Sequence, residues 1–109
     1  MGNNVIWALV SCKSSKEARS IGNKILKARM AACYSLIPKL ENKYYWPPNS
    51  GKFEISRGPL LVLETLPKNY FRLANIVKKN HSDKIPFIGR LEIKNVDSKF
   101  INWLQGEIK

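Results

Sequence analysis

The longest apolar pattern in the chain runs from Ala31 to Thr65 and is interrupted once, at residues 46–51. Both flanking stretches are rich in β-branched, aromatic and aliphatic residues, which are typical of β-strands. The interruption reads Trp-Pro-Pro-Asn-Ser-Gly, and Pro, Asn and Gly are the residues that reverse a chain. The pattern therefore predicts one β-hairpin with unusually long arms. Because a two-stranded ribbon is not stable alone, other elements must cover it.

The segment before the hairpin predicts a strand followed by a helix. Residues 5–10 form a continuous apolar run, as in a strand covered on both faces. Ser14 and Glu17 have the spacing of a capping box, and the helix that they begin should end near Met30. Gly22 lies on the apolar face of this helix, which indicates close approach to a strand.

The segment after the hairpin predicts a helix, a strand and a short final helix. Leu66-Pro67 opens the helix, Pro86 begins the strand, and Asp97 caps the terminal helix. The resulting β-α-β-β-α-β order predicts an α+β, ferredoxin-like fold with an antiparallel sheet, in a single domain of residues 1–109. In that topology the second strand is an edge strand. Pro38 agrees, because proline in a sheet requires an edge or a bulge.

The far end of the hairpin carries Tyr44, Tyr45 and Trp46, where one small domain has little core to bury them. Aromatic residues are enriched at interfaces, and a long edge strand invites pairing with another chain. We therefore expect self-association through the ribbon, with closed symmetry.

Composition adds two expectations. The chain has no apolar run that could span a bilayer and no cleavable leader pattern, so we expect a soluble intracellular protein without a membrane partner. Its formal net charge of +11 favours anionic partners. The basic residues are spread along the chain, however, which favours a solvated lysine surface over a single basic patch. We expect any nucleic-acid binding to be weak, non-specific and sensitive to salt.

The two cysteines lie at opposite ends of the predicted first helix, so Cys12 and Cys33 should not form a disulfide within one chain. Two free thiols fit a reducing compartment. His81, the only histidine, follows the second helix and falls at the same end of the sheet as Cys12. A thiolate and an imidazole can bind copper or zinc. The alternative is structural: a buried Cys12 and a helix-end His81.

Catalytic patterns are absent from the sequence. It has one histidine and no recognisable carboxylate pair, phosphate-binding glycine loop or nucleophile elbow. Glu64 is the most unusual acid because it lies on an apolar strand, where we expect it to pair with a lysine or a tyrosine. We therefore expect a protein that is not an enzyme and requires no cofactor.

Several of these segments, in order and spacing, resemble the CutA divalent-cation-tolerance family. The match includes Ala31-Ala32-Cys33, Ile37-Pro38, Tyr44-Tyr45-Trp46, Gly51-Lys52, a strand ending in Thr65, His81 followed by Pro86, and Trp103-Leu104. The resemblance implies a cytoplasmic homotrimer, a link to copper and other divalent cations, and no established catalytic activity. It supports His81 as a metal ligand and supports Cys12 only by its proximity to a family cysteine position. It also implies intersubunit positions for Cys33, Tyr44, Tyr45, Trp46, Glu64 and Trp103.

The chain departs from the family pattern at several polar positions. Ser82-Asp83-Lys84 follows His81 in place of Pro-Tyr-Glu, and Phe87 replaces an acid. Glu64 stands where a lysine is usual, and Gly58 where an acid is usual. We therefore expect weaker cation binding than in a relative with the full acidic set.

Two alternatives use the same fold or assembly. One is a basic nucleic-acid-binding module, although Leu60-Leu61-Val62-Leu63 lacks the stacking aromatics of RNA-recognition domains. The other is a trimer similar to the PII signalling proteins that binds a small anionic ligand between subunits. An acylphosphatase-type phosphatase fits less well, because residues 11–15 lack the arginine and glycines of its phosphate-binding loop.

Overall fold

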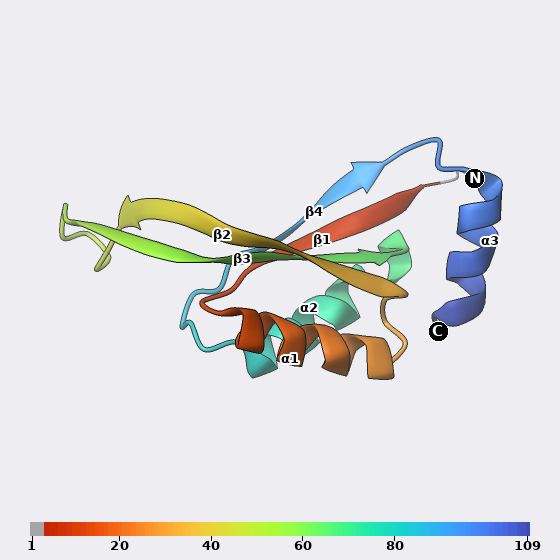
Figure 1. The fold of residues 1–109 in the computed structure, drawn as a ribbon, viewed down its shortest axis with the longest axis horizontal. Coiled ribbons are helices and arrows are strands. Elements are labelled where there is room, and N and C mark those ends of the chain that lie inside the picture. The colour runs from red at the N-terminus through yellow and green to blue at the C-terminus, as the bar shows by residue number, and fades with distance from the viewer. Residues whose placement is uncertain (1–3) are drawn as a thin grey trace.

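A four-stranded antiparallel sheet packs against two helices, and a third helix lies at one end of the molecule (Figure 1). The structure is a computed structural model, and it describes residues 4–109. The sheet order is β2-β3-β1-β4, and all neighbouring strands are antiparallel. This is the ferredoxin-like fold that the element order predicts. The elements are β1 (Val5–Ser11), α1 (Ser15–Lys27), β2 (Cys33–Tyr45), β3 (Phe53–Thr65), the 3-10 turn η1 (Pro67–Asn69), α2 (Tyr70–Asn80), β4 (Ile88–Ile93) and α3 (Ser98–Glu107).

The predicted hairpin is β2 and β3, each 13 residues long. Its pairing runs from Cys33 opposite Glu64 to Tyr45 opposite Phe53, with a register shift between Ile37 and Leu40. Pro38 lies within this shift, and β2 is the edge strand, so both expectations for that proline are confirmed. Strand β1 pairs with β3 only from Leu60 onward. The distal half of the hairpin therefore projects from the sheet as a two-stranded ribbon (Figure 1).

Helix α1 begins with the predicted cap: the Ser14 Oγ accepts the Glu17 N–H at 3.1 Å. It ends at Lys27, earlier than the predicted end near Met30. Arg29 adopts φ 59, and the N–H groups of Arg29 and Met30 bond the carbonyls of Leu26 and Ile25, at 3.0 and 3.1 Å. This arrangement is a Schellman motif, built here without glycine. The absence of a glycine signal explains the error in the predicted end.

The core lies between the sheet and helices α1 and α2. Alternate β1 side chains face the helices and are fully buried, namely Ile6, Ala8 and Val10. Gly22 lies on the buried face of α1, and an added Cβ there would come within 2.6 Å of the Tyr34 ring on β2. The predicted close approach of Gly22 to a strand is therefore confirmed.

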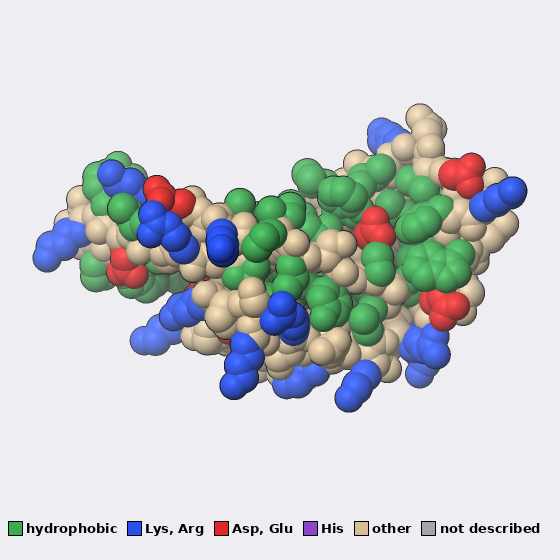
Figure 2. Space-filling view, in the orientation of Figure 1, with side chains coloured by type: hydrophobic (Ala, Val, Ile, Leu, Met, Phe, Trp, Pro, Cys, Tyr) green, Lys and Arg blue, Asp and Glu red, His purple; other side chains and the backbone are tan. Residues whose placement is uncertain are grey.

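No helix of residues 4–109 crosses the middle of the other face of the sheet, and we call it the open face. Cross-strand register places Trp7, Glu64 and Cys33 in one row of this face, with Leu91 beside Trp7. Leu9 and Val62 form the next row. In Figure 2, hydrophobic side chains gather over β1 and β4 around an acidic side chain. Leu91 is 53% exposed, so an apolar surface is presented to solvent.

Two boundaries on the C-terminal side differ from the predictions. Pro67 begins a 3-10 turn, and regular α2 starts only at Tyr70. Strand β4 starts at Ile88, two residues after Pro86. Asp97 caps α3 as predicted, accepting the Lys99 N–H at 2.9 Å.

Gly58 allows the β1–α1 turn to lie against β3, and replacing it should be costly. A Cβ at Gly58 would fall 2.1 Å from the Cys12 carbonyl oxygen, a backbone atom that cannot rotate away. We expect Gly58→Ala to lower the free energy of unfolding by about 3 kcal/mol through overpacking. The matched control is Gly106→Ala, whose Cβ meets nothing within 4 Å and which should be neutral or stabilise α3 by up to about 1 kcal/mol. Denaturant midpoints at equal protomer concentration measure both, and equal stability of the two variants would contradict the prediction.

Candidate metal centre

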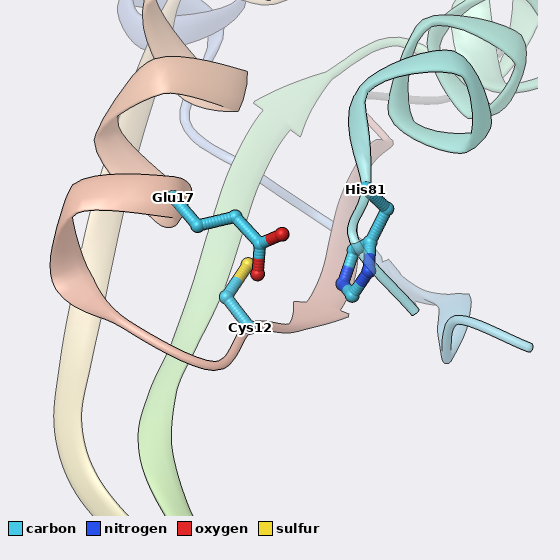
Figure 3. A group of neighbouring side chains, drawn as sticks. All are labelled: Cys12, Glu17 and His81. Atoms are coloured by element: carbon cyan, nitrogen blue, oxygen red, sulfur yellow. The ribbon is translucent and has the colours of Figure 1, made fainter. Parts of the chain in front are cut away.

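Three potential metal ligands from separate elements meet at one end of the sheet. Cys12 follows β1, Glu17 lies in the first turn of α1, and His81 follows α2 (Figure 3). One ligand atom of each residue lies within 4.8 Å of the other two. The prediction that Cys12 and His81 lie at the same end is thus confirmed.

The Cys12 thiol is 4% exposed and keeps its proton at neutral pH. Burial raises its pKa to about 12, and the carboxylates of Glu17 and Asp83 act in the same direction. Its Sγ lies 3.8 Å from the Val10 carbonyl oxygen, within the range of a weak S–H hydrogen bond. A cation that binds this sulfur must therefore displace a proton.

The imidazole of His81 is fully buried and bonded on both nitrogens. Nε2 lies 2.7 Å from the Ser11 carbonyl oxygen, and Nδ1 accepts the Asp83 N–H at 3.0 Å. A carbonyl only accepts and an amide N–H only donates, so the ring is neutral with its proton on Nε2. A cation that coordinates the imidazole must replace one of these two hydrogen bonds.

Glu17 links the same segments through backbone contacts. Oε1 accepts the Lys13 N–H at 3.0 Å, and Oε2 accepts the Ser82 N–H at 2.8 Å. Burial acts to raise the pKa of this carboxyl, but the hydrogen bonds from Ser82 and Lys13 outweigh burial and lower it. The group is therefore an anion at neutral pH. Each oxygen retains a second lone pair that can face a cation.

Glu17 is the potential ligand that sequence reasoning missed, because its spacing from Ser14 identified it only as a capping residue. The sequence does contain a signal for this residue: Glu17 lies only five residues after Cys12, across the turn that follows β1, so the two side chains are close in the chain. Four backbone groups hydrogen-bond to the cluster: the Ser11 carbonyl accepts, and the N–H groups of Lys13, Ser82 and Asp83 donate. Backbone donors and acceptors are common to all residues, so no sequence motif marks them.

A second group of polar side chains lies on the open face and corrects the expectation for Glu64. The Glu64 Oε2 accepts the Trp7 Nε1–H at 2.8 Å, and the Glu64 Oε1 accepts the Cys33 S–H at 2.7 Å. The expected lysine or tyrosine partner is thus wrong: the sheet register places Trp7 and Cys33 beside Glu64 instead. Burial, and then the Glu64 hydrogen bond, raises the pKa of Cys33 to about 12. Both cysteines are free thiols, as predicted.

The remaining predicted interface residues lie on the hairpin and on α3. Tyr45 is 68% exposed and stacks on Phe53 across the hairpin at a centroid distance of 4.7 Å. The Tyr44 hydroxyl lies 3.4 Å from the Glu54 carboxylate. Trp46 is half-buried, and its backbone N–H donates to the Lys52 carbonyl oxygen at 2.9 Å, which closes the end of the hairpin. Trp103 on α3 is 45% exposed.

An open groove of about 950 Å³ separates the hairpin from the loop after α2. Three lysines and three acids line it, together with aromatic side chains that include Tyr44 and Trp46. The groove therefore has mixed charge, which does not favour a small anionic ligand. The lining charges are Lys13, Lys43, Lys84, Glu41, Glu54 and Asp83.

Sequence comparison decides the family. A profile described as "CutA1 divalent ion tolerance protein" matches residues 6–107, nearly the whole chain. The chain belongs to the CutA1 family. Similar curated members include protein CutA 1, chloroplastic, of Oryza sativa subsp. japonica, which is 26% identical over 104 residues. That match covers 95% of this chain, and the chain spans 57% of the rice protein's length. The divalent-cation tolerance protein CutA of Escherichia coli O139:H28 is 27% identical over 109 residues, which cover 98% of this chain and 95% of that protein.

Solved CutA1 structures share the fold. The crystal structure of CutA1 from Oryza sativa has a TM-score of 0.91 at 25% identity, covering 99% of this chain and 96% of that chain. The CutA of Archaeoglobus fulgidus, described as a periplasmic divalent cation tolerance protein, has a TM-score of 0.90 at 22% identity, covering 96% and 99% of the two chains. At that identity the second likeness concerns the fold alone. Within residues 4–109, no helix has the length and apolar character needed to cross a bilayer.

Proposed function

We propose that this CutA1-family protein is a non-catalytic homotrimer that binds copper or another divalent cation at Cys12, Glu17 and His81. The observation that carries the proposal is the convergence of three different donor atoms within 4.8 Å of one another. The name of the Escherichia coli relative, a divalent-cation tolerance protein, supports a role connected with such ions.

The donor set fits a borderline or soft cation. Sulfur, imidazole nitrogen and carboxylate oxygen together suit copper or zinc rather than calcium or magnesium, which prefer oxygen alone. Three protein donors leave a coordination position open, as in sites that exchange a ligand. When a cation takes one imidazole nitrogen of His81, the hydrogen bond on the other nitrogen, to the backbone of Ser11 or Asp83, would remain to orient the ring.

Two features limit the affinity that we expect. Binding must remove the Cys12 proton and replace one hydrogen bond of His81. The net charge of +11 also repels a cation at long range. Both effects favour modest affinity over permanent occupancy, as suits a protein that senses or buffers an ion.

The trimer is supported by the open face and by the ribbon. Leu91 and the distal hairpin expose apolar side chains that an isolated protomer leaves in water. Glu64 lies among apolar residues of the open face, yet its two oxygens already have donors from Trp7 and Cys33. A carboxylate with its hydrogen bonds satisfied can be covered by a partner at lower cost than a bare one. We also place the protein in the cytoplasm, where Cys12 and Cys33 would stay reduced.

Zinc binding to the reduced protein tests the cation proposal without the thiol oxidation that copper(II) causes. Equilibrium dialysis should give one Zn²⁺ per protomer. Because the Cys12 pKa is raised to about 12, binding releases its proton, and the affinity should increase about tenfold per pH unit between about pH 6 and 8. Absence of binding, or binding that is independent of pH, would contradict the proposed site.

A further inference from the structure

We propose that the outer surface of helices α1 and α2 is a binding face for the phosphate backbone of a double-stranded nucleic acid, independent of base sequence. The proposal concerns the helical layer, on the opposite side of the sheet from the open face, and it does not depend on the metal centre or on the trimer.

Helix α1 contributes four basic residues, α2 contributes three and the turn before α2 contributes one, and all eight are exposed. On α1 they are Lys16, Arg19, Lys24 and Lys27. On α2 and the turn before it they are Lys68, Arg72, Lys78 and Lys79. We call these side chains together the basic helical face. They recur at helical spacing opposite the buried stripes of both helices, so each row lies on one side of its helix.

The two rows form one surface. Helices α1 and α2 lie next to each other on the same face of the sheet (Figure 1), and the Lys24 Nζ donates to the Asn80 Oδ1 at 2.6 Å. In Figure 2, Lys and Arg side chains follow the edge of the molecule where α1 lies. The chain's excess of positive charge, dispersed along the sequence, is thus concentrated in space.

In the described part of the chain, no acid neutralises this surface. Glu17 is the one carboxylate in the two helices, and both of its oxygens accept backbone N–H groups at the metal centre. Asp83, in the adjoining loop, pairs with Lys13 at 3.2 Å. The basic helical face therefore lacks the interspersed acids that make an ordinary charged surface electrically neutral.

The dimensions match a duplex. Helix α1 has 13 residues and is therefore about 20 Å long. A duplex carries about one negative charge per 1.7 Å of its axis, so about 12 phosphates lie along this length, roughly half of them on the near side. Eight exposed cations in two rows can neutralise such a set.

The neutral residues on the same face favour a nucleic acid over an anionic membrane. Ser20, Asn23 and Asn75 are exposed between the cations, and these types bond phosphate and sugar oxygens. Membrane-surface helices instead place several large apolar residues beside their cations. Phe71, 75% exposed, is the one such residue here. On the open face the Glu64 carboxylate lies beside Trp7, where it would repel the phosphates of a single strand that stacked its bases there.

Fluorescence anisotropy with labelled duplexes of about 20 base pairs, one DNA and one RNA, tests the proposal across a series of salt concentrations. The slope of log K against log [salt] is about −0.9 per phosphate contact, so engagement of half to all of the basic helical face gives about −3.5 to −7. The double variant Arg19→Gln/Arg72→Gln should weaken binding about tenfold or more and reduce the steepness of the slope by about 2. The two duplexes show whether the backbone of DNA or RNA is preferred.

The matched control is Lys94→Gln/Lys99→Gln, which removes the same charge from exposed positions at the end of β4 and the start of α3. It should change affinity less than threefold and leave the slope unchanged. Equal losses in the two double variants would show that net charge alone attracts the duplex, and would overturn the proposal. Binding to phosphatidylserine-containing vesicles that depends on Phe71, shown by Phe71→Ala, without duplex binding would overturn it in favour of a membrane.

Discussion

Replacing Leu91 with aspartate is expected to turn the proposed trimer into monomers. Leu91 is 53% exposed in the protomer and lies beside Trp7 on the open face. An aspartate at an exposed position costs an isolated protomer little, usually within about 0.5 kcal/mol. In the proposed trimer the same residue is covered by a partner subunit. An unpaired carboxylate there costs several kcal/mol in each of the three copies.

Phe71→Asp is the matched control for this variant. Phe71 is also a large exposed apolar residue, at 75%, but it lies on α2, on the helical side of the sheet. We expect Phe71→Asp to remain a trimer. Sedimentation velocity at micromolar protomer concentration distinguishes the species. A monomeric wild type, or a Leu91→Asp protein that sediments as the wild type does, would show that the open face is not the interface.

Replacing Cys12 with serine is expected to weaken zinc binding by at least about 100-fold. The change exchanges sulfur for oxygen with little change in shape, but a serine hydroxyl does not deprotonate near neutral pH to supply an anionic ligand. Loss of supporting contacts around metal sites typically costs 10–100-fold, and loss of a ligand itself should cost more. Competition against a chromophoric chelator, with the thiols kept reduced, measures the change.

Cys33→Ser is the control for Cys12→Ser. Both thiols have a pKa raised to about 12, but Cys33 donates to Glu64 on the open face and is absent from the cluster. The zinc affinity of Cys33→Ser should therefore stay within about threefold of the wild type. His81→Ala should lose affinity as Cys12→Ser does. Unchanged binding in His81→Ala would leave His81 with a purely structural role, joining Ser11 to the loop after α2.

The sequence predicts most of the fold because each element carries a local signal. The hairpin follows from two apolar arms around a Pro/Asn/Gly turn, and the start of α1 follows from Ser14 and Glu17. The glycine at position 22 of an amphipathic helix predicts that the helix lies close to a strand, and the Tyr34 ring on β2 confirms this contact. The end of α1 was predicted wrongly because Arg29 adopts the left-handed conformation that usually marks glycine.

The candidate site was only partly predictable. Topology alone brings Cys12 and His81 to one end of the sheet. The third candidate ligand, Glu17, and the partners of Glu64 depend on how the elements pack, through hydrogen bonds such as Ser82 N–H to Glu17 and Trp7 Nε1–H to Glu64. Such contacts join residues 65 and 57 positions apart and have no local pattern.

Absorption spectroscopy with Co²⁺ in place of zinc tests the central claim most directly, because cobalt reports which atoms coordinate it. Titration of the reduced wild-type protein should produce a sulfur-to-cobalt charge-transfer band that saturates at one Co²⁺ per protomer. The band should persist in Cys33→Ser and disappear in Cys12→Ser. Cobalt binding without such a band, or a band that survives in Cys12→Ser, would contradict a cation site at Cys12, Glu17 and His81.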